Sequence, residues 1–287
     1  MPVDGAGEGA TGASAEAIRA HYDTPTEFFR LWLGDDLVYS AALFGAGDDL
    51  AAAQNRKLDH HIAAAGVAPG DRVLDVGCGW GAMLRRLTGT AGAASAVGIT
   101  LSTAQADWVR GLRLPGVEVR EEHWRDHRPD APYDAVVSIG AFEHFARPGL
   151  APEAKLAAYR EFFAWCRSVL KPGGRLSLQT IAFVTSIGTM PPFFAAEIFP
   201  ETEPPRIWEP MAAAEDAFEL VALRNDRDHY EHTLRIWQRT LTERHAEAIA
   251  LVGEEAVARF HRYLKVSAMA FRIGNICLLR MSFLRRD

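Results

Sequence analysis

The residues best suited to hold a ligand are three glycines, Gly77, Gly79 and Gly81, which follow the strand-like segment 72–76. Glycine adopts backbone angles that other residues avoid, and it lets a ligand lie against the main chain. Asp75 adds a carboxylate just before the turn. Because a parallel α/β sheet binds ligands at the carboxyl ends of its strands, the pattern predicts a strand, a ligand-binding turn and a helix. An ordinary strand-to-helix turn has similar glycines, so the neighbouring residues must decide.

The residues after the next expected strand argue against two kinds of nucleotide site. A dinucleotide-binding fold usually places an acidic residue about 20 residues beyond its glycines, where it binds the ribose. This chain has Thr100 there, and Ser102 and Gln105 begin the next expected helix. It also lacks a Gly-Lys-Ser or Gly-Lys-Thr phosphate loop. An NAD enzyme and a nucleotide triphosphatase are therefore both disfavoured.

Glu143 is the candidate general base. It follows the expected strand 133–139, which places it at the ligand-binding edge of the sheet. An apolar pocket would raise its pKa and suit it to proton removal, directly or through a water. The alternative is a carboxylate that only satisfies backbone donors at the start of a helix. The histidines have no convincing metal-ligand spacing, so we predict no metal site.

These groups must be positioned by alternating strands and helices. The strands are expected at 72–76, 95–99, 117–121, 133–139 and 175–181, and the helices between them at 80–88, 102–113 and 152–170. Such alternation predicts a doubly wound parallel sheet. Upstream we expect helices at 15–22, 24–33 (with Thr24 as N-cap) and 49–65; downstream, strands at 218–223 and 277–284 and helices at 231–252 and 254–270.

The composition is that of a globular protein with a small-molecule substrate. The 287 residues are 48% hydrophobic and 24% charged, with a net charge of −6, so no nucleic-acid partner is predicted. No apolar run is long enough for stable membrane insertion. Three sparse cysteines and an N-terminus unlike a signal peptide favour a cytoplasmic protein. A homo-oligomer is left open.

Three segments in order resemble the cyclopropane fatty acid synthase and mycolic acid cyclopropane synthase family of class I S-adenosylmethionine methyltransferases. They are 75–81, 98–102 and 138–145. Further matches lie at 21–23, 39–40, 179–181, 196–200 and 229–230. The resemblance covers essentially all of the chain after residue 14. It implies a Rossmann-like sheet with N-terminal helices and a helical or loop cap over the active site.

On this basis we expect one domain built from five segments. They are a disordered leader (1–14), an N-terminal helical cap (15–66), a cofactor-binding core (67–182), an active-site cover (183–217) and a C-terminal part that completes the domain (218–287). The cover is rich in proline and aromatic residues, which suits a lid over a site better than a surface loop.

The resemblance implies S-adenosylmethionine as the cofactor and S-adenosylhomocysteine as its product. The residues that it assigns to the cofactor are Tyr39, Ser40, Asp75, Gly77, Gly79, Gly81, Thr100, Leu101, Gln105, Trp124 and Arg125. The backbone of the glycines would lie against the methionine part of the cofactor, and Trp124 would lie beside its adenine. Arg125 stands where the family commonly has an acidic residue.

In the catalytic half the sequence departs from the family, which surrounds a bicarbonate ion with five residues. Glu143, Ile181 and Tyr230 match that set. Ala41 stands at the cysteine position, and Gln179 at the histidine position. Alanine offers no polar group, and glutamine donates a hydrogen bond but does not titrate. Bicarbonate binding and ring closure are therefore doubtful for this chain.

The sequence thus predicts an S-adenosylmethionine-dependent C-methyltransferase of specialised metabolism, acting on an alkene, a prenyl-like chain or an aromatic carbon. Nine aromatic residues are candidates for an apolar acceptor pocket: Phe28, Phe29, Trp32, Phe142, Phe193, Phe194, Phe199, Trp208 and Trp237. Two alternatives stay open. One is N- or O-methylation of a small molecule, and the other is a catalytically silent cofactor-binding subunit.

Overall fold

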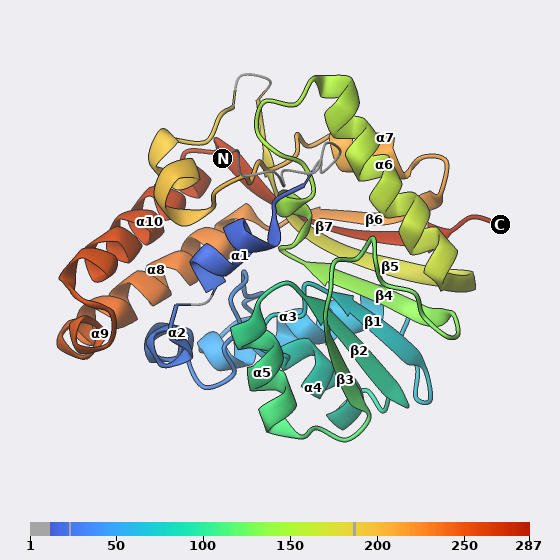
Figure 1. The fold of residues 1–287 in the computed structure, drawn as a ribbon, viewed down its shortest axis with the longest axis horizontal. Helices are drawn as coiled ribbons and strands as arrows, with labels where there is room; N and C mark the ends of the chain where they lie inside the picture. Colours follow the sequence, from blue (N-terminus) through green and yellow to red (C-terminus); the bar gives the residue numbers. More distant parts are fainter. Residues whose placement is uncertain (1–11, 23, 186–187) are drawn as a thin grey trace, which may run out of the picture.

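A seven-stranded sheet runs through the molecule (Figure 1). The computed structural model describes residues 12–22, 24–185 and 188–287. Its strands are β1 (Arg72–Val76), β2 (Ser95–Thr100), β3 (Val117–Glu121), β4 (Tyr133–Ile139), β5 (Leu170–Phe183), β6 (Phe218–Asn225) and β7 (Ile276–Arg285). They follow the order β3-β2-β1-β4-β5-β7-β6, and β7 alone runs antiparallel to the strands beside it, β5 and β6. The predicted α/β fold is confirmed.

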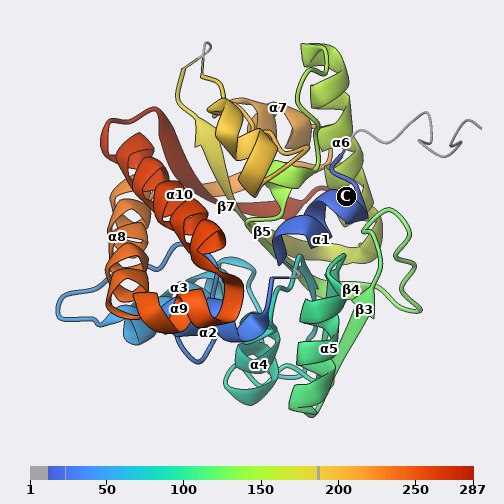
Figure 2. The ribbon, with the colours of Figure 1, turned by 60° about the vertical axis from the view of Figure 1, so that its left-hand side comes forward.

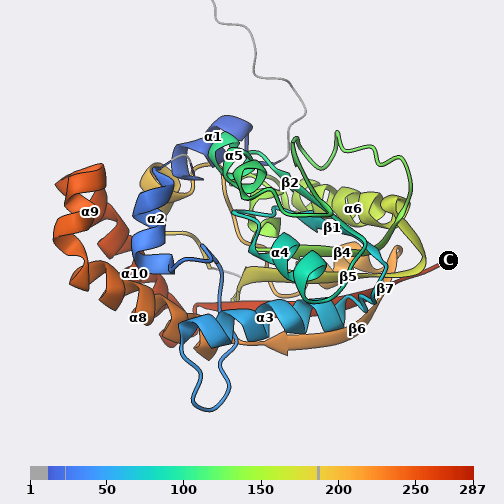
Figure 3. The ribbon, with the colours of Figure 1, turned by 90° about the horizontal axis from the view of Figure 1, so that it is seen from below.

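Helices cover both faces of the sheet, and Figure 3 shows α3 (Leu50–Ala64) and α6 (Pro152–Val169) on opposite sides. Successive strand residues point to opposite faces. Val73 and Val137 therefore pack with α3, α4 (Ala82–Gly89) and α5 (Thr103–Leu112), whereas Leu74 and Val136 pack with α6 and α7 (Glu209–Ala214). Because β1 pairs in parallel with β2 and β4, the carboxyl ends of the three strands lie along one edge, where the glycine turn lies.

A separate group of helices lies beside the sheet (Figure 2). It contains α2 (Thr26–Leu33), α8 (Arg227–Glu243), α9 (His245–Val252) and α10 (Glu254–Arg272), whereas α1 (Ala15–Tyr22) lies against α5. Its apolar core joins Phe28, Phe29 and Trp32 of α2 to Trp237 of α8 and Phe260 of α10. The N-terminal and C-terminal parts of the chain are thereby packed together.

Some element boundaries differ from the prediction. Thr24 is not the N-cap of α2, because its hydroxyl donates to the carbonyl of His21 instead. The expected helix 231–252 is divided at Arg244, whose backbone leaves the helical conformation between α8 and α9. Residues 1–11 of the expected leader lie outside the described residues. The amide of Ala13 donates to the His144 carbonyl at 2.8 Å, so this end of the leader is folded against the chain.

Replacing Asp49 by alanine is expected to destabilise the protein by about 1 kcal/mol. The Asp49 carboxylate caps α3 by accepting a hydrogen bond from the Ala52 amide at 2.8 Å. Thermal denaturation would measure the effect. Asp107→Ala is the control, because Asp107 lies inside α5 and its ion pair among the described residues is with a surface arginine, Arg110. Equal losses in both variants would contradict the capping role.

Candidate active site

The first candidate site is a cavity at the carboxyl ends of β1, β2 and β4. We call it the glycine-turn cavity. Nine of the eleven residues predicted for the cofactor line it: Tyr39, Ser40, Asp75, Gly77, Gly79, Thr100, Leu101, Gln105 and Trp124. Gly81 does not line it itself but lies between Trp80 and Ala82, which both do. The structure thus gathers them around one space.

The turn itself is shaped to hold a ligand against the main chain. Gly77, Gly79 and Gly81 have φ angles of +80°, +53° and +83°, in the region that disfavours side chains. A Cβ on Gly77 would lie 2.6 Å from the Cβ of Ala141, whereas one on Gly79 would meet no atom within 4 Å. The backbone is therefore tightly packed below the turn and open above it, as a cofactor cradle requires.

The far end of the glycine-turn cavity offers an aromatic face and polar groups. Thr100 donates its hydroxyl proton to Oε1 of Gln105 at 2.8 Å, which orients the amide. The indole of Trp124 is 3% exposed, and its N–H has no partner in the described part of the chain. An apolar slot with a few oriented polar groups fits a nucleoside.

Arg125 does not line the glycine-turn cavity, which corrects its assignment as a cofactor contact. Its guanidinium pairs with Glu161 at 2.7 Å and lies over the outer face of the Trp124 ring, 4.5 Å from the centroid. The salt bridge draws the side chain to the surface of α6. Arg125 supports Trp124 from outside the cavity.

Lys57 is a site residue that the sequence did not reveal. It is fully buried in the wall of the glycine-turn cavity, and its ammonium donates to Oγ of Ser40 at 2.8 Å. Burial, with the charge of Arg280, lowers the pKa of Lys57 to about 7. Burial also raises the pKa of Asp75 to about 7, against the opposing effect of Lys57. The cavity thus contains a lysine and a carboxylate that both titrate near neutrality.

A second cavity adjoins the first. We call it the Glu143 cavity. Tyr22, Tyr39, Ser40, Gly140 and His144 line both cavities, so the two spaces meet at these residues. Its remaining wall comes largely from β5, the segment after β5, α8, α10 and β7: Gln179, Ile181, Phe183, Phe194, Phe199, Tyr230, Leu234, Val266, Phe271, Ile276 and Leu278. All four residues predicted to act in catalysis are among its lining residues.

Glu143 lies at the head of this cavity, in the short turn η1 (Phe142–His144) after β4. One of its oxygens accepts a hydrogen bond from the Ile181 amide at 2.6 Å. The other, Oε2, is buried and has no partner among the described residues. Burial raises the pKa of Glu143 to about 7, although the Ile181 amide acts in the opposite direction. Such a carboxylate is suited to accept a proton near neutral pH.

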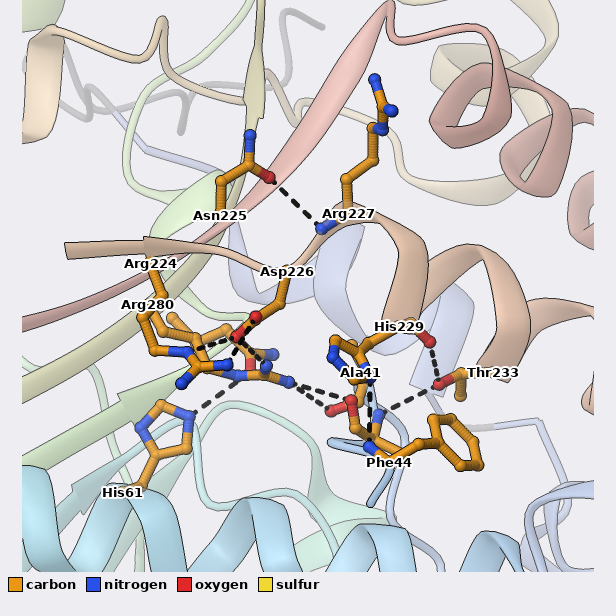
Figure 4. A network of polar contacts seen from close by, with 12 residues as sticks. Ala41, Phe44, His61, Arg224, Asn225, Asp226, Arg227, His229, Thr233 and Arg280 are labelled. Atoms are coloured by element: carbon orange, nitrogen blue, oxygen red, sulfur yellow. Dashed lines mark hydrogen bonds and ion pairs between the residues drawn. The ribbon is translucent and has the colours of Figure 1, made fainter. Parts of the chain in front are cut away.

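Gln179 belongs to a buried polar network with Arg280, and Figure 4 shows Arg280 with its neighbours Asp226 and His61. Its Oε1 accepts hydrogen bonds from Nε of Arg280 at 2.8 Å and from the ring of His61 at 3.3 Å. Arg280 is 2% exposed and also pairs with Asp226. Its remaining amino group donates to the carbonyl of Ala41 at 3.0 Å. Arg280 therefore contacts both positions, 41 and 179, at which the sequence departs from the resembled family.

Few of the nine aromatic candidates line the Glu143 cavity. Phe194 and Phe199 do so, and Trp208 is 52% exposed at the surface. The other six pack in the hydrophobic cores: Phe28, Phe29, Trp32, Phe142, Phe193 and Trp237. Helix packing takes most of this aromatic surface. Tyr22, Tyr263 and Phe271 line the cavity as well. No sequence pattern indicated that Tyr263 and Phe271 belong to the site.

His144 also lines both cavities. Its ring pairs with the hydroxyl of Thr202 at 2.7 Å, and burial lowers its pKa to about 4. The His144 ring is therefore neutral near pH 7, and it helps to hold the segment after η2 (Phe194–Ile198) against η1. In the described ranges, no cluster of metal-binding side chains is found, and no helix is long and apolar enough to cross a bilayer.

The family described as mycolic acid cyclopropane synthetase matches residues 10–281 of this chain. The chain belongs to this family. Cyclopropane mycolic acid synthase MmaA2 of Mycobacterium tuberculosis is 35% identical to it over 288 aligned positions, which cover 91% of this chain and 94% of that protein. Cyclopropane mycolic acid synthase 1 of the same organism is 34% identical, with 90% and 93% covered.

Solved structures of the mycolic acid cyclopropane synthetase family have the same fold. The cyclopropane synthase MmaA2 from Mycobacterium tuberculosis superposes with a TM-score of 0.86 at 33% identity, covering 95% of this chain and 99% of that one. Mycolic acid cyclopropane synthase CmaA1 complexed with SAH and CTAB gives 0.85 at 32% identity, with the same coverage. Fold and family together make the chain an S-adenosylmethionine-dependent methyltransferase.

Proposed function

We propose that this chain transfers the methyl group of S-adenosylmethionine to an alkene carbon of an apolar acceptor, and that Glu143 takes up the proton that the product must lose. When bound, the cofactor supplies an electrophilic methyl group. The observation that carries the proposal is the Oε2 oxygen of Glu143, which is buried in the wall of the Glu143 cavity and has no partner among the described residues. The neighbouring His144 is one of the residues at which the two cavities meet.

The glycine-turn cavity supports the cofactor assignment residue by residue. The open space above Gly79 accommodates the methionine part, and Ser40, held by Lys57, lies beside it. Gln105 and Trp124 offer an oriented amide and an aromatic face to the nucleoside. Positioning by these groups, rather than acid–base chemistry, is their contribution to the rate.

The Glu143 cavity supports an apolar acceptor. Phe194, Phe199, Phe271 and Leu278 give it a largely apolar lining, and the aromatic faces stabilise positive charge that develops on a carbon skeleton. SAH and CTAB are both bound in the CmaA1 structure, and CTAB is a long-chain amphiphile. A chain of this kind, such as a lipid alkene or a prenyl-like compound, is the substrate class we propose.

The proposal is tested by incubating the enzyme with methyl-labelled S-adenosylmethionine and a panel of lipid alkenes, prenyl compounds, indoles and amines. We expect label on carbon in at least one alkene or prenyl product, detected by mass spectrometry. Label confined to nitrogen or oxygen would favour the small-molecule alternative. Tight cofactor binding without transfer to any acceptor would favour the silent subunit.

The rate is expected to rise with pH and to level off above about pH 7. The raised pKa of Glu143 means that its carboxyl is protonated, and unable to accept a proton, below that value. The measurement is kcat at saturating cofactor from pH 5.5 to 8.5. Because Asp75 and Lys57 also titrate near pH 7, cofactor affinity must be measured over the same range. A flat kcat profile would contradict the base assignment.

A further inference from the structure

Strand β6 is the last strand at one edge of the sheet (Figure 3). Among the described strands it pairs with β7 alone, so its other side offers backbone N–H and C=O groups to a further strand. Three of its apolar side chains are exposed: Leu220 by 38%, Val221 by 46% and Leu223 by 43%. They are a third of the nine large apolar side chains exposed in the described part of the chain. An edge of this kind is a template for pairing with another strand.

A β-bulge decides which way these side chains point. In a regular strand, Leu220 and Leu223 would lie on opposite faces, because an odd number of residues separates their positions. Between Leu220 and Ala222, however, the pairing with β7 shifts by one residue, so Val221 is extra. Leu220 and Leu223 are therefore on the same face, the one on which α6 and α7 pack, because their partners on β7 belong to that core.

A second copy of this chain fits the edge about a two-fold axis that passes through Ala222 at right angles to the sheet. The two β6 strands then run antiparallel, and Leu223 faces Leu220 of the second copy, so four leucines meet on one face. On the other face, Arg224 lies opposite Glu219 of the second copy, which pairs opposite charges. Both contacts occur twice, once on each side of the axis, as an interface between identical chains requires.

Neighbouring registers lose these contacts. With the axis at Leu223, Leu220 would face Asn225 of the second copy, and Arg224 would face Ala222. With the axis at Leu220, the charge pairs are lost as well. The match of apolar to apolar and of positive to negative is therefore specific to the register centred on Ala222.

We propose that the exposed edge of β6 is a self-association surface, through which two copies of this chain join their sheets. The interface is only one strand wide, so it is smaller than that of a permanent dimer, and we expect a dissociation constant on the order of 10 μM. At the lower concentrations used for kinetics the chain is then a monomer. Substitutions on β6 leave methyl transfer unchanged there, because residues Phe218–Asn225 line neither cavity.

The first test is sedimentation equilibrium of the full chain from about 1 to 200 μM, where the mass should rise from that of one chain towards that of two. Leu220→Lys and Leu223→Lys should each weaken association at least about tenfold, because a lysine on a strand edge opposes pairing. Leu251→Lys is the matched control. Leu251 is 42% exposed on α9, away from the edge, so its replacement should leave the dissociation constant unchanged.

Cross-linking tests the register. The axis places the two copies of Ala222 directly opposite each other, with Cα atoms about 4.5 to 5.5 Å apart. This separation suits a disulfide, so Ala222→Cys should form a covalent dimer on oxidation. Leu223→Cys should not, because its two copies are offset along the strands by more than a disulfide spans. The native cysteines do not compete, because all three are buried: Cys78, Cys166 and Cys277.

A wild-type chain that stays monomeric up to about 200 μM would overturn the inference and would show that the bulge protects the edge instead. A dimer that persists in both lysine variants would place the interface on another surface. Preferential cross-linking of Leu223→Cys would contradict the register. Binding of S-adenosylhomocysteine, measured first, shows that each variant is folded.

Discussion

Replacing Glu143 by glutamine should lower kcat for methyl transfer by about 100- to 10,000-fold, the usual contribution of a general base. Glutamine keeps the size of the side chain and an oxygen that can accept from the Ile181 amide. It cannot accept a proton. Cofactor affinity should change little, because Glu143 lines only the second of the two cavities. Steady-state kinetics and calorimetry with S-adenosylhomocysteine measure the two effects separately.

The same variant is expected to be more stable than the wild type at pH 8. The pKa of Glu143 is raised from 4.5 to about 7 in the folded state, so the folded protein binds its proton more tightly than the unfolded chain. Stability from this group is complete below about pH 4.5 and is lost as the pH rises through 7. Glu143→Gln removes that penalty, by up to about 3 kcal/mol.

If Glu143→Gln were inactive because it is misfolded, it would not be more stable than the wild type. The loss of kcat and the gain in stability together therefore identify the role of Glu143. Glu219→Gln is the matched control, because Glu219 is exposed on β6, far along the sheet from the site. It should change neither activity nor stability. Full activity of Glu143→Gln would show that another group removes the proton.

Replacing Gly77 by alanine should destabilise the protein by about 3 kcal/mol and weaken cofactor binding at least about tenfold. The φ angle of +80° is unfavourable for alanine, and its Cβ would lie 2.6 Å from the Cβ of Ala141. Relief of that contact must move the turn or η1, and both border the glycine-turn cavity. Chemical denaturation and calorimetry with S-adenosylhomocysteine give the two values.

Gly173→Ala separates the two contributions. Gly173 has a similar φ angle of +74°, but a Cβ there would meet no atom within 4 Å, and it lies in neither cavity. This control should lose only the conformational part, about 1 to 2 kcal/mol, with unchanged cofactor affinity. If Gly77→Ala lowered the free energy of unfolding and the cofactor affinity no more than Gly173→Ala does, the close packing beneath the turn would be irrelevant to cofactor binding.

The cofactor half of the site was predictable because its signals are local in sequence. Gly77, Gly79 and Gly81 follow a strand directly, and Thr100 and Gln105 follow the next one, so the sheet topology alone brings them together. Arg125 was misplaced for a simple reason. Its neighbour Trp124 faces the cavity, whereas Glu161, 36 residues away, draws Arg125 outward.

The acceptor half could be predicted only in part. Arg280 contacts the Ala41 carbonyl across 239 residues and Gln179 across 101, and neither spacing has a pattern that periodicity would reveal. Lys57 looks like any other lysine of an amphipathic helix until the fold buries it against Ser40. Trp208 is a large aromatic residue of the kind that lines apolar pockets, but the packing around it leaves its side chain at the surface.

The central claim is that the methyl group goes to carbon in the Glu143 cavity. It is tested most directly with trideuteromethyl-labelled S-adenosylmethionine and a lipid alkene, followed by mass spectrometry of the product. The account predicts a product that holds two or three deuterium atoms on carbon, and almost none of it with the Glu143→Gln variant. Deuterium found only on nitrogen or oxygen, or equal product from both proteins, would contradict it.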